Sequence, residues 1–95
     1  MPDLPDRKAL QAFYEEHLAS FQDVVDVSEV ATFTGYNRRT VGEWIRKGRL
    51  KAVLYNGRYI IPKSCLLDWL CSEEYNQIIR KSEKHILTLL KIGER

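Results

Sequence analysis

The chain is poor in cysteine, and its two cysteines are badly spaced for a disulfide or a metal site. Cys65 and Cys71 lie six residues apart, whereas side chains that share one face of a helix are three or four residues apart. His17 and His85 are isolated from both cysteines and from each other. We therefore expect the cysteines to pack in the interior, the histidines to lie on helix faces, and the surroundings to be reducing.

Long apolar runs, internal repeats and low-complexity segments are also missing from the sequence. No run approaches the roughly 18 apolar residues of a membrane-spanning helix, and the opening MPDLPD lacks the basic and apolar pattern of a signal peptide. The sequence has no nucleophile–base pair, no metal-ligand spacing and no phosphate-binding loop. We therefore expect a cytoplasmic, nucleoid-associated protein that is not an enzyme and has no cofactor.

Enough apolar residues are present for a modest core. The hydrophobic content of 44%, with ten aromatic residues, excludes a disordered chain. A length of 95 residues corresponds to one small domain, so we expect residues 1–95 to fold as a single unit.

Acidic residues are scarce in the middle of the chain. Residues 36–63 contain eight lysines and arginines and a single acid, Glu43, which makes a net charge of +7. Residues 1–35 carry a net charge of −5, and residues 64–95 are balanced. A basic block in a folded segment is typical of a surface that meets a polyanion, and we expect that polyanion to be nucleic acid.

The N-terminal part of the chain has helical apolar spacing. Residues 1–22 are predicted to form a helix with Pro5 in its first turn and either Asp3 or Asp6 as its cap. Residues 24–27 are β-prone and are predicted to be extended.

Two short helices are predicted next. Ser28 is the expected cap of the first helix, which ends at Gly35 in a left-handed conformation. Asn37 is the expected cap of the second helix, which Gly48 closes. Two short helices joined by a tight turn that contains glycine form a helix-turn-helix.

A β-hairpin and more helix are predicted after Gly48. Asn56-Gly57 separates two strand-like runs, which is the strongest short-range signal for a hairpin. Pro62 is expected to stop the second strand and Ser64 to cap a third helix.

The last predicted element is a helix over residues 73–93. Its apolar positions have coiled-coil spacing over about two heptads, at Tyr75, Ile79, Ser82, Ile86 and Leu89. Two interpretations stay open: this helix packs on Leu10, Phe13, Tyr14 and Leu18 of the first helix, or it forms the seam of a homodimer.

The predicted arrangement suggests contacts with double-stranded DNA. In a helix-turn-helix the second helix enters the major groove, where arginine pairs with guanine and glutamate accepts from cytosine. Its outward residues are predicted to be Arg38, Arg39, Gly42, Glu43 and Arg46. The candidate base readers are Arg38, Arg39, Thr40, Glu43 and Arg46. The wing tip Asn56, Gly57 and Arg58 is predicted to reach the minor groove or the phosphates. Lys47, Lys51 and Lys63 are predicted to contact phosphates.

Residues 24–71 resemble the excisionase family, whose members are small winged helix-turn-helix modules similar to the MerR DNA-binding domain. The resemblance is carried by the segments VSEVA from residue 27, RTV from residue 39 and GRYIIP from residue 57, together with Gly35, Trp44-Ile45 and Lys47-Gly48. It implies a fold with a recognition helix in the major groove and a wing beside it. Because the predicted N- and C-terminal helices lie outside the match, the full expectation is a mainly α fold: a winged helix-turn-helix with a two-stranded wing and these extra helices. It also implies DNA bending beside an integrase, or transcriptional regulation, in a phage or mobile element.

The sequence departs from this family at two positions. Gly42 stands where the family usually has a larger residue, and Thr34 replaces a usual aliphatic residue. Gly42 either permits close approach of the backbone to DNA or reflects a lost base contact. The alternative to DNA binding is a protein-interaction module that keeps the fold without the contact.

Overall fold

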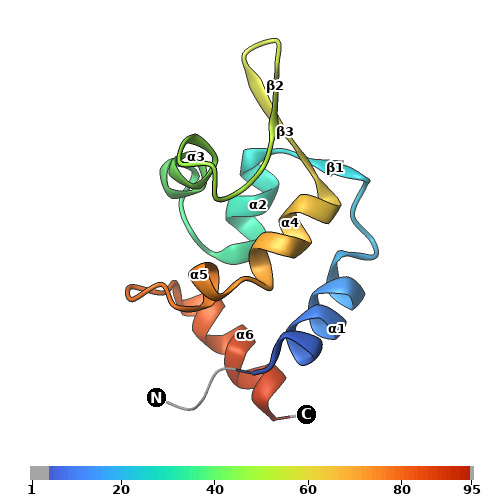
Figure 1. Ribbon diagram of the computed structural model, residues 1–95, viewed down its shortest axis with the longest axis vertical. Coiled ribbons are helices and arrows are strands. Elements are labelled where there is room, and N and C mark those ends of the chain that lie inside the picture. The colour runs from blue at the N-terminus through green and yellow to red at the C-terminus, as the bar shows by residue number, and fades with distance from the viewer. Residues whose placement is uncertain (1–4, 95) are drawn as a thin grey trace.

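The structure, a computed structural model, describes residues 5–94 as six α-helices and a small antiparallel sheet. In chain order the elements are α1 (Arg7–Leu18), β1 (Val24–Val25), α2 (Val27–Thr34), α3 (Arg38–Arg46), β2 (Val53–Tyr55), β3 (Arg58–Pro62), α4 (Lys63–Leu70), α5 (Glu73–Asn76) and α6 (Glu83–Gly93). The β2–β3 hairpin projects from one end of the molecule beside α3, and α1 and α6 lie at the other end (Figure 1). The predicted fold class, a mainly helical winged helix-turn-helix, is confirmed.

The sheet has three strands, where the sequence predicted only the two of the wing. Its order is β1-β3-β2, so β3 is central, and Val25 of β1 lies opposite Ile61 of β3. Both of these side chains are buried. The β-prone run was predicted as extended but not as a pairing strand, because its partner lies about 36 residues away, beyond the reach of local patterns. By pairing with β3, the additional strand β1 anchors the wing to the body of the molecule.

The helix-turn-helix forms much as its turn residues predict. Gly35 ends α2 with a φ of 80°, in the left-handed region. The side chain of Asn37 caps α3 by accepting a hydrogen bond from the backbone N–H of Thr40 at 2.7 Å. After α3, Gly48 has a φ of 75° and turns the chain toward the wing.

The cap of α2 is Asp26, so the prediction of Ser28 is wrong. The Asp26 carboxylate accepts from the backbone N–H of Glu29 at 2.8 Å, and the Glu29 carboxylate accepts from the backbone N–H of Asp26 at 3.2 Å. This reciprocal capping box satisfies two backbone donors at once, whereas a serine two residues later satisfies at most one.

The prediction that Ser64 caps α4 is also wrong. The helix begins at Lys63, directly after β3, and its cap position is Pro62, which makes no side-chain hydrogen bond. The backbone N–H of Lys63 instead donates to the carbonyl of Asp23 at 2.8 Å. The neighbouring chain therefore satisfies a helix-start donor that the sequence analysis assigned to a local cap.

The predicted helix over residues 73–93 is not continuous. It is replaced by the short helix α5, a non-helical segment and α6. Ser72 caps α5 by accepting from the N–H of Tyr75, and Ser82 caps α6 by accepting from the N–H of His85 at 3.0 Å. The coiled-coil spacing therefore crosses a loop: Tyr75 is buried, whereas Ile79 is 95% exposed.

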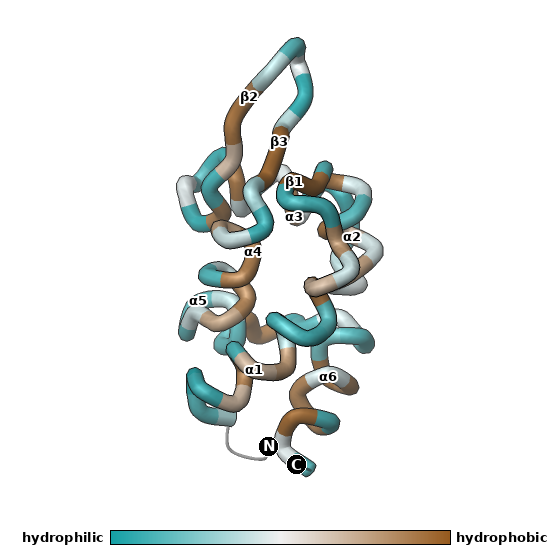
Figure 2. The backbone as a smooth tube through the Cα atoms, turned by 90° about the vertical axis from the view of Figure 1, so that its right-hand side faces the viewer, coloured by the Kyte–Doolittle hydropathy of each residue, from teal (hydrophilic) through white to brown (hydrophobic). Residues whose placement is uncertain are grey.

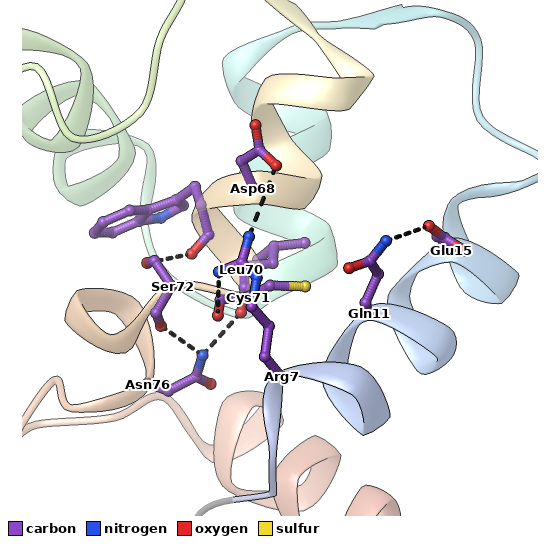
Figure 3. Close-up of polar contacts among 9 residues, drawn as sticks. Arg7, Gln11, Glu15, Asp68, Leu70, Cys71, Ser72 and Asn76 are labelled. Atoms are coloured by element: carbon purple, nitrogen blue, oxygen red, sulfur yellow. Dashed lines mark hydrogen bonds and ion pairs between the residues drawn. The ribbon is translucent and has the colours of Figure 1, made fainter.

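The N-terminal helix is shorter than residues 1–22. It begins at Arg7, with Asp6 as its cap and Pro5 before its first turn, and the alternative cap, Asp3, lies outside the described residues. The Arg7 guanidinium donates to the carbonyl of Cys71 at 3.2 Å, which ties α1 to the end of α4 (Figure 3).

The core lies between these helices. Leu10, Phe13, Tyr14 and Leu18 of α1 are buried in it, as is Ile92 of α6. This confirms that α6 packs within the chain. Trp44 and Trp69 are core residues, as predicted, with ring centroids 5.3 Å apart. Cys65 and Cys71 are free thiols.

Across residues 5–94, no helix has both the length and the apolar character to span a membrane. The same part of the chain contains no cluster of three histidine, cysteine or acidic side chains suited to holding a metal ion.

Candidate nucleic-acid interface

Four arginines from two elements line one cleft at the wing end of the molecule. Arg38, Arg39 and Arg46 come from α3, and Arg58 comes from the wing. The cleft has a volume of about 380 Å³, and its remaining walls include the start of α2. We call it the arginine cleft. Four guanidinium groups on one concave surface are suited to phosphates and to guanine edges.

The two faces of α3 differ sharply in burial. Val41 and Trp44 are buried, with relative exposures of 0% and 5%. The predicted readers Arg38, Arg39, Glu43 and Arg46 are exposed. Thr40 is half-buried, and its backbone N–H is already used in the Asn37 cap. The apolar stripe therefore fixes α3 against the core and leaves its charged side free.

The prediction that Gly42 lies on the open surface is wrong, because the side chain of Arg46 covers this residue. A Cβ atom at position 42 would lie 3.1 Å from Nη1 of Arg46, four residues further along the helix. Gly42 itself is buried and lines the arginine cleft. The absence of a side chain lets the Arg46 guanidinium lie against the helix backbone.

The wing tip is a tight turn with both central residues in left-handed conformations. Asn56 has a φ of 50° and Gly57 a φ of 76°, which is the pattern of a type I′ hairpin turn. Tyr55 pairs with Arg58 across the turn. The turn thus places the Arg58 side chain on the last cross-strand pair of the hairpin.

The three predicted phosphate lysines do not line the arginine cleft. Lys47 and Lys51 are exposed and line a separate hollow that also contains Asp68 and Glu74. Lys63 is half-buried, and its ammonium donates to the backbone carbonyl of Phe21 at 3.2 Å. The structure therefore brings together the arginines and leaves the lysines at other places.

The start of α2 and Tyr59 belong to the arginine cleft but were missed in the sequence. Asp26, Val27 and Ser28 line the cleft, so the start of α2, with the carboxylate of its cap Asp26, forms part of the cleft wall. The Asp26–Glu29 spacing of a capping box was the signal that could have located this helix start. For Tyr59, only its place on the strand after the turn gave any indication.

A buried polar network supports the turn from behind. The hydroxyl of Tyr36, in the turn before α3, lies 2.6 Å from Nδ1 of His85 in α6. Nε2 of His85 lies 3.3 Å from Oδ1 of Asn76. The Asn76 amide group donates to the carbonyls of Leu70 and Ser72 at 2.9 and 2.8 Å (Figure 3).

This network requires neutral His85. The Asn76 amide nitrogen is committed to two carbonyls, so its oxygen accepts and Nε2 of His85 donates. Nδ1 is then free of a proton and accepts from the Tyr36 hydroxyl. Burial of the ring, with a smaller effect from the nearby Lys81 charge, lowers the pKa of His85 from 6.5 to about 4.

Two further side chains of the same region hold the end of α2. The Ser82 hydroxyl donates to the carbonyl of Thr34 at 2.7 Å, and the Lys84 ammonium donates to the carbonyl of Thr32 at 2.7 Å. These carbonyls belong to the last turn of α2, where the backbone carbonyl groups have no hydrogen-bond donors within their own helix. The C-terminal region therefore fixes the angle at which the chain leaves α2 for α3.

Comparison with known proteins gives one match. The model of a family described as "Helix-turn-helix domain" matches residues 24–74, more than half of the chain. No curated protein matches the chain. No solved structure matches it either.

Proposed function

We propose that this chain, which belongs to the helix-turn-helix domain family, binds double-stranded DNA through α3 and the wing. The observation that carries the proposal is the arginine cleft, in which Arg38, Arg39 and Arg46 of α3 meet Arg58 of the wing. A recognition helix beside a wing can occupy adjacent grooves of one duplex.

Each candidate residue has a proposed role in this complex. Arg38, Arg39, Thr40, Glu43 and Arg46 face the major groove, where Arg39 is the main reader of guanine. Asn56, Gly57 and Arg58 reach the minor groove. Lys47 and Lys51 approach flanking phosphates, which set affinity without sequence preference. Lys63 has the weakest claim to such a contact, because its ammonium is bound to the Phe21 carbonyl.

The biological role we propose is that of an excisionase-like architectural factor or a small transcriptional regulator. The sequence resemblance to the excisionase family supports it, together with the wing beside the recognition helix. An integrase as partner, a MerR-like mode of binding and a phage or mobile-element origin belong to the same proposal. A homodimer through α6 is compatible with the exposed Ile86, Leu87 and Leu90 of that helix.

A salt-dependent titration tests DNA binding directly. The full chain is titrated against a random duplex pool by fluorescence anisotropy at roughly 50 and 200 mM salt, where counterion release predicts a steep loss of affinity. The bound fraction is then sequenced to obtain the preferred site. Absence of binding at both salt concentrations contradicts the proposal and favours a protein-interaction module.

Two substitutions and a control distinguish recognition of DNA bases from contact with phosphates. Arg39→Ala is expected to lower discrimination between the selected site and other sequences by about 1–3 kcal/mol. Lys51→Ala is expected to weaken all sequences alike and to lower the salt slope by about 1. Lys8→Ala removes an exposed charge from α1, at the opposite end of the molecule, and is expected to change neither quantity. Equal, sequence-independent losses for Arg39→Ala and Lys51→Ala contradict the assignment of the reader.

A further inference from the structure

The wing carries more exposed apolar surface than its position in the fold explains. All three residues of β2 are exposed, Val53 by 58%, Leu54 by 63% and Tyr55 by 62%. An antiparallel strand with one solvent-facing side normally alternates apolar and polar residues. Here the neighbouring residues Val53 and Leu54, which point to opposite sides of the strand, are both apolar, and the tube is brown along the part of β2 below the hydrophilic tip (Figure 2).

This apolar surface is not used by the body of the protein. None of the three β2 residues belongs to the core described above or to the partly buried residues that pack against it. β2 is also one of the two edge strands of the sheet. Exposed apolar side chains on a free edge strand are a risk of aggregation, so their presence indicates a partner that covers them.

The charges around the wing indicate which partner this is. Arg58 lies opposite Tyr55, so the guanidinium and the phenol share one face of the hairpin. Arg58 also lines the arginine cleft with three arginines of α3. Tyr55 and Arg58 also line a second hollow with Asp26 and Glu29, the two residues of the α2 capping box. A partner that spans both Tyr55 and the arginine cleft is favoured when it is anionic and also apolar at close range. The minor groove of DNA is both, with phosphates along its edges and sugars and base steps within.

We propose that the wing enters the minor groove tip first and that Tyr55 acts as an apolar wedge that opens a base step and bends the duplex. Tyr55 is the apolar residue nearest the turn, because only Asn56 and Gly57 separate it from Arg58. Leu54, one residue further from the tip and on the opposite face, packs on a sugar wall. Proteins that insert apolar side chains in this groove kink DNA by unstacking one step. This inference rests on the proposed DNA binding.

The test uses the full chain and the site selected from the random pool. Bending is measured by circular-permutation mobility shift, and unstacking by 2-aminopurine fluorescence with the probe moved along the site. Wild type is expected to bend the DNA and to brighten the probe at one position. Tyr55→Ala is expected to abolish the bright position and most of the bend, with roughly tenfold weaker binding. Its salt slope is expected to stay unchanged, because no charge is removed.

Two further variants make the result specific. Tyr55→Leu keeps an apolar wedge and is expected to retain the bend. Ile79→Ala removes the 95% exposed isoleucine between α5 and α6 and is expected to behave as wild type. Retention of both bend and affinity in Tyr55→Ala overturns the wedge while leaving DNA binding intact. Straight DNA in the wild-type complex overturns it as well.

The remaining outcomes also decide the question. Failure of wild type to bind any duplex overturns the proposed function and the wedge together. Sedimentation of the free protein tests the other occupant, a second copy of this chain. A dimer that Tyr55→Ala dissociates assigns the apolar surface of the wing to self-association and overturns the wedge.

Discussion

Acidification from pH 7 to pH 4 is expected to remove about 3 kcal/mol of stability that depends on His85 remaining neutral. The ring is 1% exposed and stacks on Tyr75 with centroids 4.1 Å apart. Its two nitrogens are bound to the Tyr36 hydroxyl and to the Asn76 carbonyl oxygen. In the neutral ring, Nδ1 accepts a hydrogen bond from the Tyr36 hydroxyl. A proton added at Nδ1 faces the hydrogen of that hydroxyl, so the hydrogen bond is lost. The new positive charge is also buried near Lys81.

The direction of the effect follows from proton linkage. The unfolded chain binds this proton with a pKa near 6.5, whereas the folded chain binds it only with a pKa of about 4. Between these values the unfolded state carries more protons, so the free energy of unfolding rises with pH. The contribution of neutral His85 is complete above pH 6.5 and is lost as the pH falls toward 4. At about 1.4 kcal/mol per pH unit, the interval corresponds to roughly 3 kcal/mol.

The measurement is urea denaturation of wild type and His85→Gln at several pH values between 7 and 4. Glutamine does not titrate, and it keeps one donor and one acceptor for Asn76 and Tyr36. The difference between the two proteins removes every contribution to the pH dependence that does not involve His85. We expect that difference to shrink by up to about 3 kcal/mol as the pH falls. A difference that stays constant, or an NMR titration that places the His85 pKa at 6.5 or above, refutes the reasoning.

Three substitutions of turn and helix residues give further predictions. Gly35→Ala is expected to destabilise by more than Gly57→Ala in thermal denaturation: both glycines have positive φ, but only the Cβ at position 35 would meet another side chain, Lys84, at 2.7 Å. Equal losses contradict the packing of α6 on the turn. Gly42→Ala is expected to raise stability by up to about 1 kcal/mol, because alanine favours a helix and the flexible Arg46 can move, while DNA affinity falls as the guanidinium is displaced. A lower melting temperature contradicts this explanation. Asn37→Ala is expected to cost about 0.5–2 kcal/mol through the lost cap of α3, and urea denaturation that shows no loss contradicts it.

The parts of the fold that sequence patterns predicted are those set by neighbouring residues. Gly35, Asn37 and the Asn56-Gly57 turn carry their conformational preferences with them, and each is found where it was predicted. The fold class followed from these turns and from the apolar spacing between them.

The errors in the predicted structure arise where contacts between residues far apart in the sequence determine the conformation. The break between α5 and α6 was missed because the apolar spacing was extended across it and the helix caps Ser72 and Ser82 were not considered. His85 gave no local sign of burial, since its partners lie 49 and 9 residues away. The burial of Gly42 depends on how one arginine side chain folds back, which no spacing rule predicts.

The candidate site was predicted only in part, because some of its features follow from local helical periodicity and others depend on contacts between distant residues. The outward positions of α3 follow from helical periodicity, so four of its five predicted readers are exposed. The meeting of Arg58 with the α3 arginines depends on the path of the chain after Gly48. The separation of the lysines from that cleft depends on the packing of α4, which net charge alone does not show.

The position of α3 in this chain depends on residues outside the family match. That match ends at residue 74, yet Asn76, Ser82 and His85 make the contacts that hold the end of α2 and the turn. Tyr36 links the two parts, because its hydroxyl meets His85 while its ring packs on Trp44 of α3 at 5.1 Å. We therefore expect a change in α6, whether by protonation of His85 or by a partner on its exposed apolar side, to reach α3 through Tyr36 and also through Tyr75, whose ring stacks on His85 and packs on Trp44. In this protein α6 and α3 are expected to respond together.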